Sequence, residues 1–296
     1  MAEGFTTSER LPETGLLLVG MGPGSVAAMT QEALAAASSA THRRYEAYTA
    51  LWPKHELKSL ESIIGPIKKV MRPEVEQPEE LFALASTSLV ALLVVGDPLQ
   101  ATTHVDLQLQ AIERGIECRV FHGISVTTLV TGAIGLSNYR FGRQTTLTYP
   151  YGGWVATSPM ETIAMNQFTG LHTLALLDLD PTGQGTGSQQ PMAPEDAVRS
   201  IEMMCNKISD GFDGRVFENE NPVDMLMKSA LTAMVNTDIS AMRVILCSDM
   251  GTSEQNIITT TVGALSAQRG GRLNCLVFPA TTGEVEEKAV LRWTEE

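Results

Sequence analysis

Cysteine is scarce in this chain, and its spacing excludes the common cysteine-based sites. The 296 residues contain four cysteines, at positions 118, 205, 247 and 275. None belongs to a CxxC pair, and none lies near a histidine at the spacing of zinc ligands. Cys247 and Cys275 stand inside apolar runs, where cysteine behaves as a small core residue. We therefore expect no metal site, and the pattern fits a reducing, cytoplasmic compartment.

Long apolar runs and a secretory leader are also missing. No apolar run reaches the ~20 residues that a membrane-spanning helix needs. The opening stretch, MAEGFTTSERLPETG, is polar and carries acids, without the basic and apolar segments of a signal peptide. The sequence therefore predicts no membrane partner, and we expect residues 1–14 to form a disordered tail.

Basic residues are too few for a surface that binds nucleic acid. The chain has 21 Lys and Arg against 34 Asp and Glu, a formal net charge of −13. Sequence-independent binding of nucleic acid depends on Lys and Arg meeting phosphates, so we expect no direct nucleic-acid partner. Because 43% of the residues are hydrophobic, the composition is that of a globular protein, and the length suits one large domain or two smaller ones.

In the first part of the chain, short apolar runs alternate with helical patterns. The runs predict buried strands at 16–20, 88–95 and 116–123. The patterns between them predict helices at 29–40, 73–86 and 104–115, with a loop or short strand at 60–70. This alternation is typical of an α/β domain with a largely parallel sheet.

The pattern changes near residue 122, which predicts one α/β domain over 15–122 and a second over 123–296. The second is expected to open with a helix entered through Ser125. Further strands are predicted at 144–150, 172–180, 242–249 and 273–279, and further helices at 158–169 and 197–210.

Two turns that follow predicted strands are candidate ligand sites. GMGPGS, residues 20–25, approaches a dinucleotide fingerprint, but Ser25 takes the place of the third glycine and Pro23 removes an amide donor, so a tight turn is favoured. Gly-Asp-Pro at 96–98 lies where ligands gather in open α/β sheets, beyond the carboxyl end of a strand. Asp97 either binds a ligand or caps the turn, and both interpretations stay open. No serine lies in a G-x-S-x-G elbow, so a hydrolase triad is not supported.

A carboxylate pair ends another predicted strand. Asp178 and Asp180 share one face, because side chains alternate along a strand. They could bind a metal or a cationic substrate, but a solvated turn is favoured. His104 follows two threonines that could cap its helix, and a lone histidine is more often structural than catalytic.

Five stretches, in this order and spacing, resemble a known family. They are VGMG at 19–22, EAYT at 46–49, VVGDPLQATTHVDL at 94–107, NYRFG at 138–142 and GLHTLALLDLD at 170–180. On them the chain resembles the diphthine synthases from about residue 15 to residue 180, and the C-terminal third matches loosely. The resemblance implies the fold of the tetrapyrrole methylases: two α/β domains with S-adenosylmethionine in the cleft between them, usually in a homodimer.

The resemblance also implies a reaction and a set of contacts. The reaction is methylation of a modified histidine on translation elongation factor 2, at the amine of a 3-amino-3-carboxypropyl group, giving diphthine. No catalytic proton acceptor can be named from it, and His104 and Asp178 are weak candidates. The positions that match contacts of the methyl donor are Pro23, Asp97, Gln100, Ser125, Val126, Leu176, Asp249 and Asn274.

Three of these positions depart from the family pattern, and they keep alternatives open. Pro23 replaces the usual leucine, while Asp249 and Asn274 stand where relatives carry alanine and histidine. The glycine-rich opening VGMGPG looks closer to the corrin-pathway methyltransferases, which share the fold, so a precorrin methyltransferase is the second hypothesis. A non-catalytic binding module that has lost its cofactor site is the third.

Overall fold

The computed structural model describes residues 10–218 and 221–294. They fold into two compact units. The first unit runs up to Leu129 and includes the segments Gln184–Gln189 and Gly251–Ser253. The second consists of Val130–Gly183, Gln190–Met250 and the residues from Glu254 onward. In the described part of the chain, no helix is both long and apolar enough to cross a membrane.

The first unit contains a five-stranded sheet in which every pair is parallel. Its order is β3-β2-β4-β1-β5. The strands are β1 Gly15–Gly20, β2 His42–Glu46, β3 Lys68–Val70, β4 Leu89–Val94 and β5 Cys118–Phe121. The helices are α1 Gln31–Ser39, α2 Lys54–Ile64, α3 Arg72–Glu76, α4 Glu79–Ala85 and α5 His104–Glu113.

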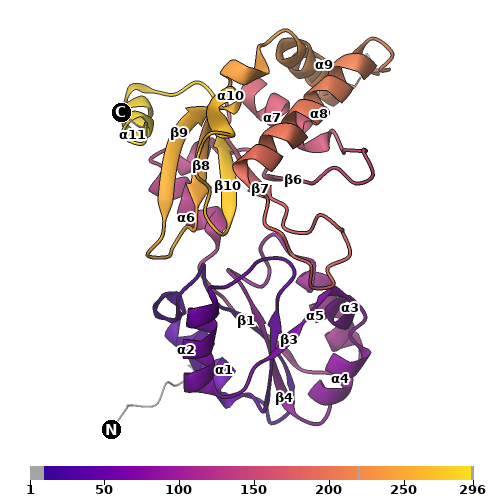
Figure 1. Ribbon diagram of the computed structural model, residues 1–296. Coiled ribbons are helices and arrows are strands. Elements are labelled where there is room, and N and C mark those ends of the chain that lie inside the picture. Colours follow the sequence, from indigo (N-terminus) through magenta and orange to yellow (C-terminus); the bar gives the residue numbers. More distant parts are fainter. Residues whose placement is uncertain (1–9, 219–220, 295–296) are drawn as a thin grey trace. The chain divides into compact units, whose positions relative to one another are not determined.

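Helices cover both faces of this sheet, which is why its central strands are apolar on both sides (Figure 1). From β1, Leu17 and Val19 pack toward the core under α1 and α2. Leu16 and Leu18 of the same strand point into a second core, under α3, α4 and α5. The carboxyl ends of the parallel strands meet at one edge of the sheet, where the loops after β1, β4 and β5 leave it.

The second unit contains a mixed sheet of order β6-β7-β10-β8-β9, in which β6 and β7 are parallel and the other pairs are antiparallel. Its strands are β6 Thr145–Leu147, β7 Thr173–Leu177, β8 Arg243–Ser248, β9 Asn256–Thr261 and β10 Asn274–Phe278. Helices α7 Ser158–Phe168, α8 Pro194–Phe212 and α9 Pro222–Val235 build its core with the sheet. The remaining helices are α6 Val126–Ala133, α10 Val262–Leu265 and α11 Glu284–Leu291.

The predicted α/β class is confirmed, and most predicted strands and helices are present. The prediction for 60–70 is wrong in part, because α2 fills the segment as far as Ile64 before β3 begins. The elements that were not predicted include β2, α9, β9, α10 and α11. Residues 1–9 of the predicted disordered tail lie outside the described residues.

The first unit extends to Leu129, beyond the residue 122 expected as a boundary. The reason lies at Gly123, where a Cβ atom would stand 2.2 Å from the carbonyl oxygen of Gly96 and 2.9 Å from the carbonyl carbon of Gly20. Only glycine allows three backbones to approach this closely. The chain after β5 therefore stays packed on the first sheet before it enters α6.

Candidate functional site

The loops after β1 and β4 are joined backbone to backbone. The N–H of Gly22 donates to the carbonyl of Gly96 at 3.1 Å, and the N–H of Gly96 donates to the carbonyl of Gly22 at 2.9 Å. Both residues have positive φ, 70° and 77°, which glycine adopts without strain. The glycines of GMGPGS and GDP therefore bring these two loops together, with the loop after β5 packed against both through Gly123.

Asp97 ties this edge of the sheet together. Its side chain is buried, with 4% exposure. Oδ1 accepts the N–H of Leu99 at 2.9 Å, which is the cap of the turn. Oδ2 accepts from His122 Nδ1 at 2.7 Å and from the N–H of Gly123 at 3.3 Å, so the carboxylate links the end of β4 to the end of β5. The cap expected from Asp-Pro is present, and the carboxylate also positions two neighbouring loops.

Gln100 belongs to a short chain of hydrogen bonds that reaches the start of α6. Thr127 Oγ1 donates to Gln100 Oε1 at 2.6 Å. Ser125 Oγ accepts the N–H of Thr127 at 3.2 Å and lies 2.9 Å from its hydroxyl. Gln100 is exposed, and within the described residues its Nε2 has no partner, so two N–H donors are available to a ligand. Val126 is partly buried beside them.

Pro23 packs against a segment that is distant in sequence. A Cβ atom on Gly251 would lie 2.3 Å from Pro23 Cγ, and Gly251 has a φ of 79°. The same close packing brings Gly24 against Thr252, whose Cγ2 would be 2.5 Å from an added Cβ. This packing explains why Gly251–Ser253 belongs to the first unit. Five of the eight predicted contacts, Pro23, Asp97, Gln100, Ser125 and Val126, thus lie on the strand-end loops of one unit and the start of α6.

A buried pair behind these loops joins the EAYT and ATTH motifs. Glu46 is fully buried, and its carboxylate accepts the N–H groups of Tyr48 and Thr49, each at 2.8 Å, and the Thr49 hydroxyl at 2.5 Å. His104, which is 1% exposed, has Nε2 4.0 Å from Glu46 Oε2. Its Nδ1 lies 3.0 Å from the carbonyl oxygen of Pro98, and because that oxygen can only accept, Nδ1 carries the proton.

His104 therefore positions the loop that carries Asp97 and Gln100, and its burial leaves it a poor candidate for taking a proton from a substrate. The Pro98 carbonyl also accepts the Thr102 hydroxyl at 2.7 Å. Thr103 provides no side-chain cap to α5. No local pattern in the sequence marks Glu46 as buried, because the segment that it ends, HRRYE, is mostly polar.

The other three predicted contacts lie together at one edge of the second sheet. Leu176 of β7 is in register with Cys275 of β10, and Asn274 is in register with Ser248 of β8. Asp249 follows Ser248 directly. Leu176 is partly buried, whereas the two polar residues are held by hydrogen bonds within their own unit.

Asp249 and Asn274 organise the start of β10. Asp249 has a φ of 46°, and its carboxylate accepts the N–H groups of Arg272 at 2.9 Å and Leu273 at 3.0 Å. Asn274 Oδ1 accepts from the Ser248 hydroxyl and the Gly271 N–H, each at 2.8 Å. Its Nδ2 donates to the carbonyls of Met192 and Gly271, each at 3.2 Å. Asp249 and Asn274, which differ from the family pattern, therefore use their side chains to build the local turn.

Asp178 and Asp180 lie in a turn, as predicted, but the turn is buried and not solvated. Asp178 Oδ2 accepts the Tyr151 hydroxyl at 2.7 Å and the Tyr149 N–H at 3.2 Å. Asp180 is 5% exposed, and its Oδ1 accepts from Thr182. Because both carboxylates already accept hydrogen bonds from neighbouring groups, this pair has a structural role. Among the residues the structure describes, no group of three or more His, Cys, Asp or Glu could hold a metal ion.

Comparison with known proteins extends these observations. The family model for the Tetrapyrrole (Corrin/Porphyrin) Methylases matches residues 15–183. A diphthine synthase of Methanoregula boonei is 36% identical over 194 residues, which are 65% of this chain and 75% of the relative. One of Haloquadratum walsbyi is 30% identical over 271 residues, 90% of this chain and 88% of the relative. A crystal structure of a diphthine synthase aligns with a TM-score of 0.74 at 24% identity, covering 94% of this chain and 95% of that one, which shows a shared fold.

Proposed function

Because the chain belongs to the tetrapyrrole methylase family and, within it, to the diphthine synthases, we propose that it is the S-adenosylmethionine-dependent methyltransferase that makes diphthine. Its acceptor is the amine of the 3-amino-3-carboxypropyl histidine on translation elongation factor 2. The observation that carries the proposal is the coverage: the relatives of this name from Methanoregula boonei and Haloquadratum walsbyi match over 75% and 88% of their own length.

The eight predicted positions are proposed as contacts of the methyl donor. In the first unit, Gln100 supports this best, because it combines exposure with two N–H donors that have no partner in the described chain. Ser125 and Val126 stand at the start of α6, and Pro23 and Asp97 lie on the joined strand-end loops. In the second unit, Leu176 offers a partly buried apolar side chain, while the side-chain atoms of Asp249 and Asn274 are occupied by hydrogen bonds within the turn that they build.

The residues present fit the chemistry of such a donor. A sulfonium donor is already activated and supplies the methyl group when it is bound. The protein then has to bind and orient, and well-oriented reactions gain roughly 7–11 kcal/mol. Rigid loops suit this role, and the Gly22–Gly96 pair, the Asp97 carboxylate and His104 fix the backbone around Gln100. The acceptor amine attacks in its neutral form, and no residue of this chain is assigned as the group that takes its proton.

We further propose a homodimer in the cytoplasm, from the same resemblance. Light scattering coupled to gel filtration measures the first, and a mass near twice 31.9 kDa is expected. Fractionation of cells, with the protein followed by an antibody, measures the second.

The function is tested by mass spectrometry of two acceptors. The full chain is incubated with S-adenosylmethionine and with elongation factor 2 that carries the 3-amino-3-carboxypropyl histidine, and in parallel with a precorrin. Mass added in methyl steps on the histidine peptide supports the proposal. Transfer to the precorrin alone would establish the corrin-pathway alternative. Donor binding without transfer to either would leave the fold correct and the acceptor wrong.

A further inference from the structure

Arg44 in the first unit carries a charge that nothing in the described structure balances. It lies on β2, in register with Leu92 of β4 and Lys68 of β3. Leu92 belongs to the core under α3, α4 and α5, so Arg44 faces the same side. The side chain is partly buried, yet within residues 10–218 and 221–294 its guanidinium makes no hydrogen bond or ion pair. None of its nitrogens is among the buried, unpartnered side-chain atoms of the described residues, so the guanidinium stays open to solvent and its N–H donors are available to a ligand.

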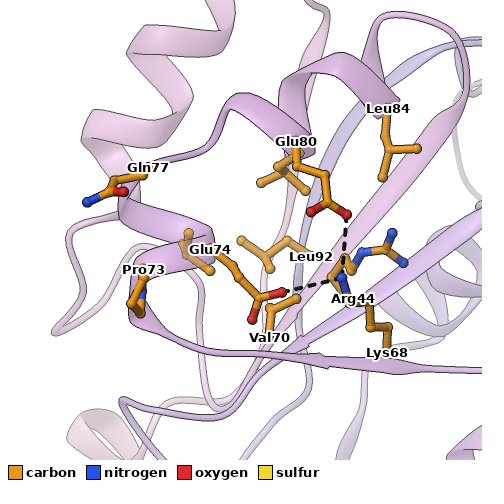
Figure 2. Close-up of a pocket in the computed structure, with 11 residues that line it drawn as sticks. Arg44, Lys68, Val70, Pro73, Glu74, Gln77, Glu80, Leu84 and Leu92 are labelled. Atoms are coloured by element: carbon orange, nitrogen blue, oxygen red, sulfur yellow. Dashed lines mark hydrogen bonds and ion pairs between the residues drawn. The ribbon is translucent and has the colours of Figure 1, made fainter. Parts of the chain in front are cut away.

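A cavity of about 240 Å³ opens beside Arg44 (Figure 2). Strands β2, β3 and β4 form one wall of it, and helices α3 and α4 form the other. Much of the lining is aliphatic, from Val70, Val75, Leu81, Leu84 and Leu92. The cavity therefore offers an apolar surface with a single available guanidinium at its strand side.

The other charged side chains of the lining are one lysine and two glutamates, which pair with one another and leave one net negative charge. Lys68 Nζ lies 3.3 Å from Glu74 Oε1 and 3.4 Å from Glu80 Oε1, and Figure 2 shows both carboxylates directed to it. No carboxylate of the described chain lies within ion-pair distance of Arg44. Glu74 and Glu80 would repel a multiply charged anion such as phosphate, since repulsion grows with the charge. A ligand with one negative charge and an apolar body fits both features.

We propose that this cavity binds a small amphipathic monocarboxylate, with its carboxylate on the Arg44 guanidinium and its apolar chain on the aliphatic lining. The fork of a guanidinium matches the two oxygens of a carboxylate. A water occupies about 30 Å³ in the liquid, so the cavity accommodates about eight non-hydrogen atoms, the size of hexanoate. None of the lining residues belongs to the loops after β1, β4 and β5, and the proposal does not depend on methyl transfer.

Hexanoate binding to the full chain tests the proposal, measured by saturation-transfer NMR and isothermal titration. Hexanol, with the same chain and no charge, and inorganic phosphate serve as comparison probes. We expect hexanoate to bind at least about tenfold more tightly than either. Arg44→Gln should weaken hexanoate binding about tenfold or more, because it removes the charged donor. Lys69→Gln is the matched control: it removes a charge one residue from Lys68, on the opposite face of β3, and should leave binding unchanged.

A second variant guards against loss of folding. Leu84→Glu places a carboxylate in the aliphatic lining and should abolish hexanoate binding with the chain still folded, as thermal unfolding would verify. Equal hexanoate affinity for the wild type and Arg44→Gln would overturn the proposal. So would the absence of hexanoate binding to the wild type, or tighter binding of phosphate or hexanol.

Discussion

The two units differ in where their buried polar groups lie. In the first, Asp97, Glu46 and His104 gather behind the carboxyl ends of parallel strands and hold loops. In the second, a comparable cluster joins His172, which directly precedes β7, and Arg140 to Glu286 of α11. The first cluster holds the strand-end loops on which we propose that the methyl donor binds, whereas the second fastens helix α11 to the sheet. Similar chemistry therefore supports the proposed donor site in one unit and stability in the other.

The cluster in the second unit is expected to lose its stabilising effect in acid, because it depends on the Glu286 carboxylate. Burial raises the pKa of Glu286, but the N–H groups of Gly283 and Ser137, His172 and Arg140 outweigh it and lower the pKa to about 2. His172 accepts the Ala280 N–H at Nδ1, at 3.0 Å, so Nε2 carries the proton toward Glu286. Burial lowers the pKa of His172, against the pull of Glu286.

The largest expected effect comes from the packed glycines of the first unit. In Gly123→Ala, the new Cβ would meet the Gly96 carbonyl at 2.2 Å, and backbone cannot move aside as a side chain can. We expect the free energy of unfolding to fall by about 3 kcal/mol, measured by chemical denaturation. Gly132→Ala is the control, since nothing lies within 4 Å of its added Cβ. This change should raise the free energy of unfolding by about 0.5–1 kcal/mol, because alanine favours the helix over glycine. Equal effects of the two changes would show that the three loops do not pack as described.

The acid response of the second unit is the next largest effect. A carboxylate whose pKa is lowered on folding stabilises the protein above its unfolded pKa, and that contribution is lost as pH falls toward the folded value. Glu286→Gln should cost about 2 kcal/mol at pH 7, and the difference from wild type should shrink as pH falls from about 4.5 toward 2. The lowered pKa of His172 acts in the same direction, since its neutral form is favoured by folding and is lost in acid.

Chemical denaturation at pH 7 and pH 3 measures this response. Glu284→Gln, on the same helix, removes a carboxylate that is 82% exposed and that pairs, among the described residues, only with Lys288. It should change the free energy of unfolding by less than about 0.5 kcal/mol at either pH. A penalty for Glu286→Gln that is the same at both pH values would contradict the assignment.

The smallest effect on stability is expected at Gln100, one of the proposed contacts of the methyl donor. Gln100→Ala loses one hydrogen bond, from Thr127, so the free energy of unfolding should fall by about 1 kcal/mol or less. Affinity for S-adenosylmethionine, measured by calorimetry, should drop about tenfold if the amide donates to the donor molecule. Gln110→Ala, on α5 of the same unit, should leave affinity unchanged. A full loss of folding in Gln100→Ala would show that the residue is structural instead.

How much of the fold could be predicted from the sequence also differs between the two units. The central strands of the first unit could be predicted because they are continuous apolar runs ended by glycine or Gly-Asp-Pro, as in LLLVG and LVALLV. Strand β2 was not predicted because HRRYE is mostly polar, and the strand is buried by its place in the sheet between β3 and β4. In the second unit, β9 is rich in threonine and α9 lies in a segment without a clear pattern, so neither gave a strong periodic signal.

The site was predicted through resemblance more than through chemistry. Asp97 was recognised as a candidate from its place after a strand, but its bonds to His122 and Gly123 join residues that no local pattern connects. Glu46 and His104 are similarly distant in sequence, and their pairing is visible only in the fold. The roles of Asp249 and Asn274 in shaping the start of β10 depend on strand register, which the sequence did not define.

Calorimetric titration of S-adenosylmethionine into the wild type and Asp97→Ala tests the central claim most directly: the strand-end loops of the first unit hold the methyl donor. Thermal unfolding confirms first that the variant is folded. We predict binding to the wild type, a loss of at least about tenfold in Asp97→Ala as the loops lose their tie, and no change in Asp106→Ala, an exposed acid of α5. Absence of binding to the wild type, or equal affinity in a folded Asp97→Ala, would contradict the account.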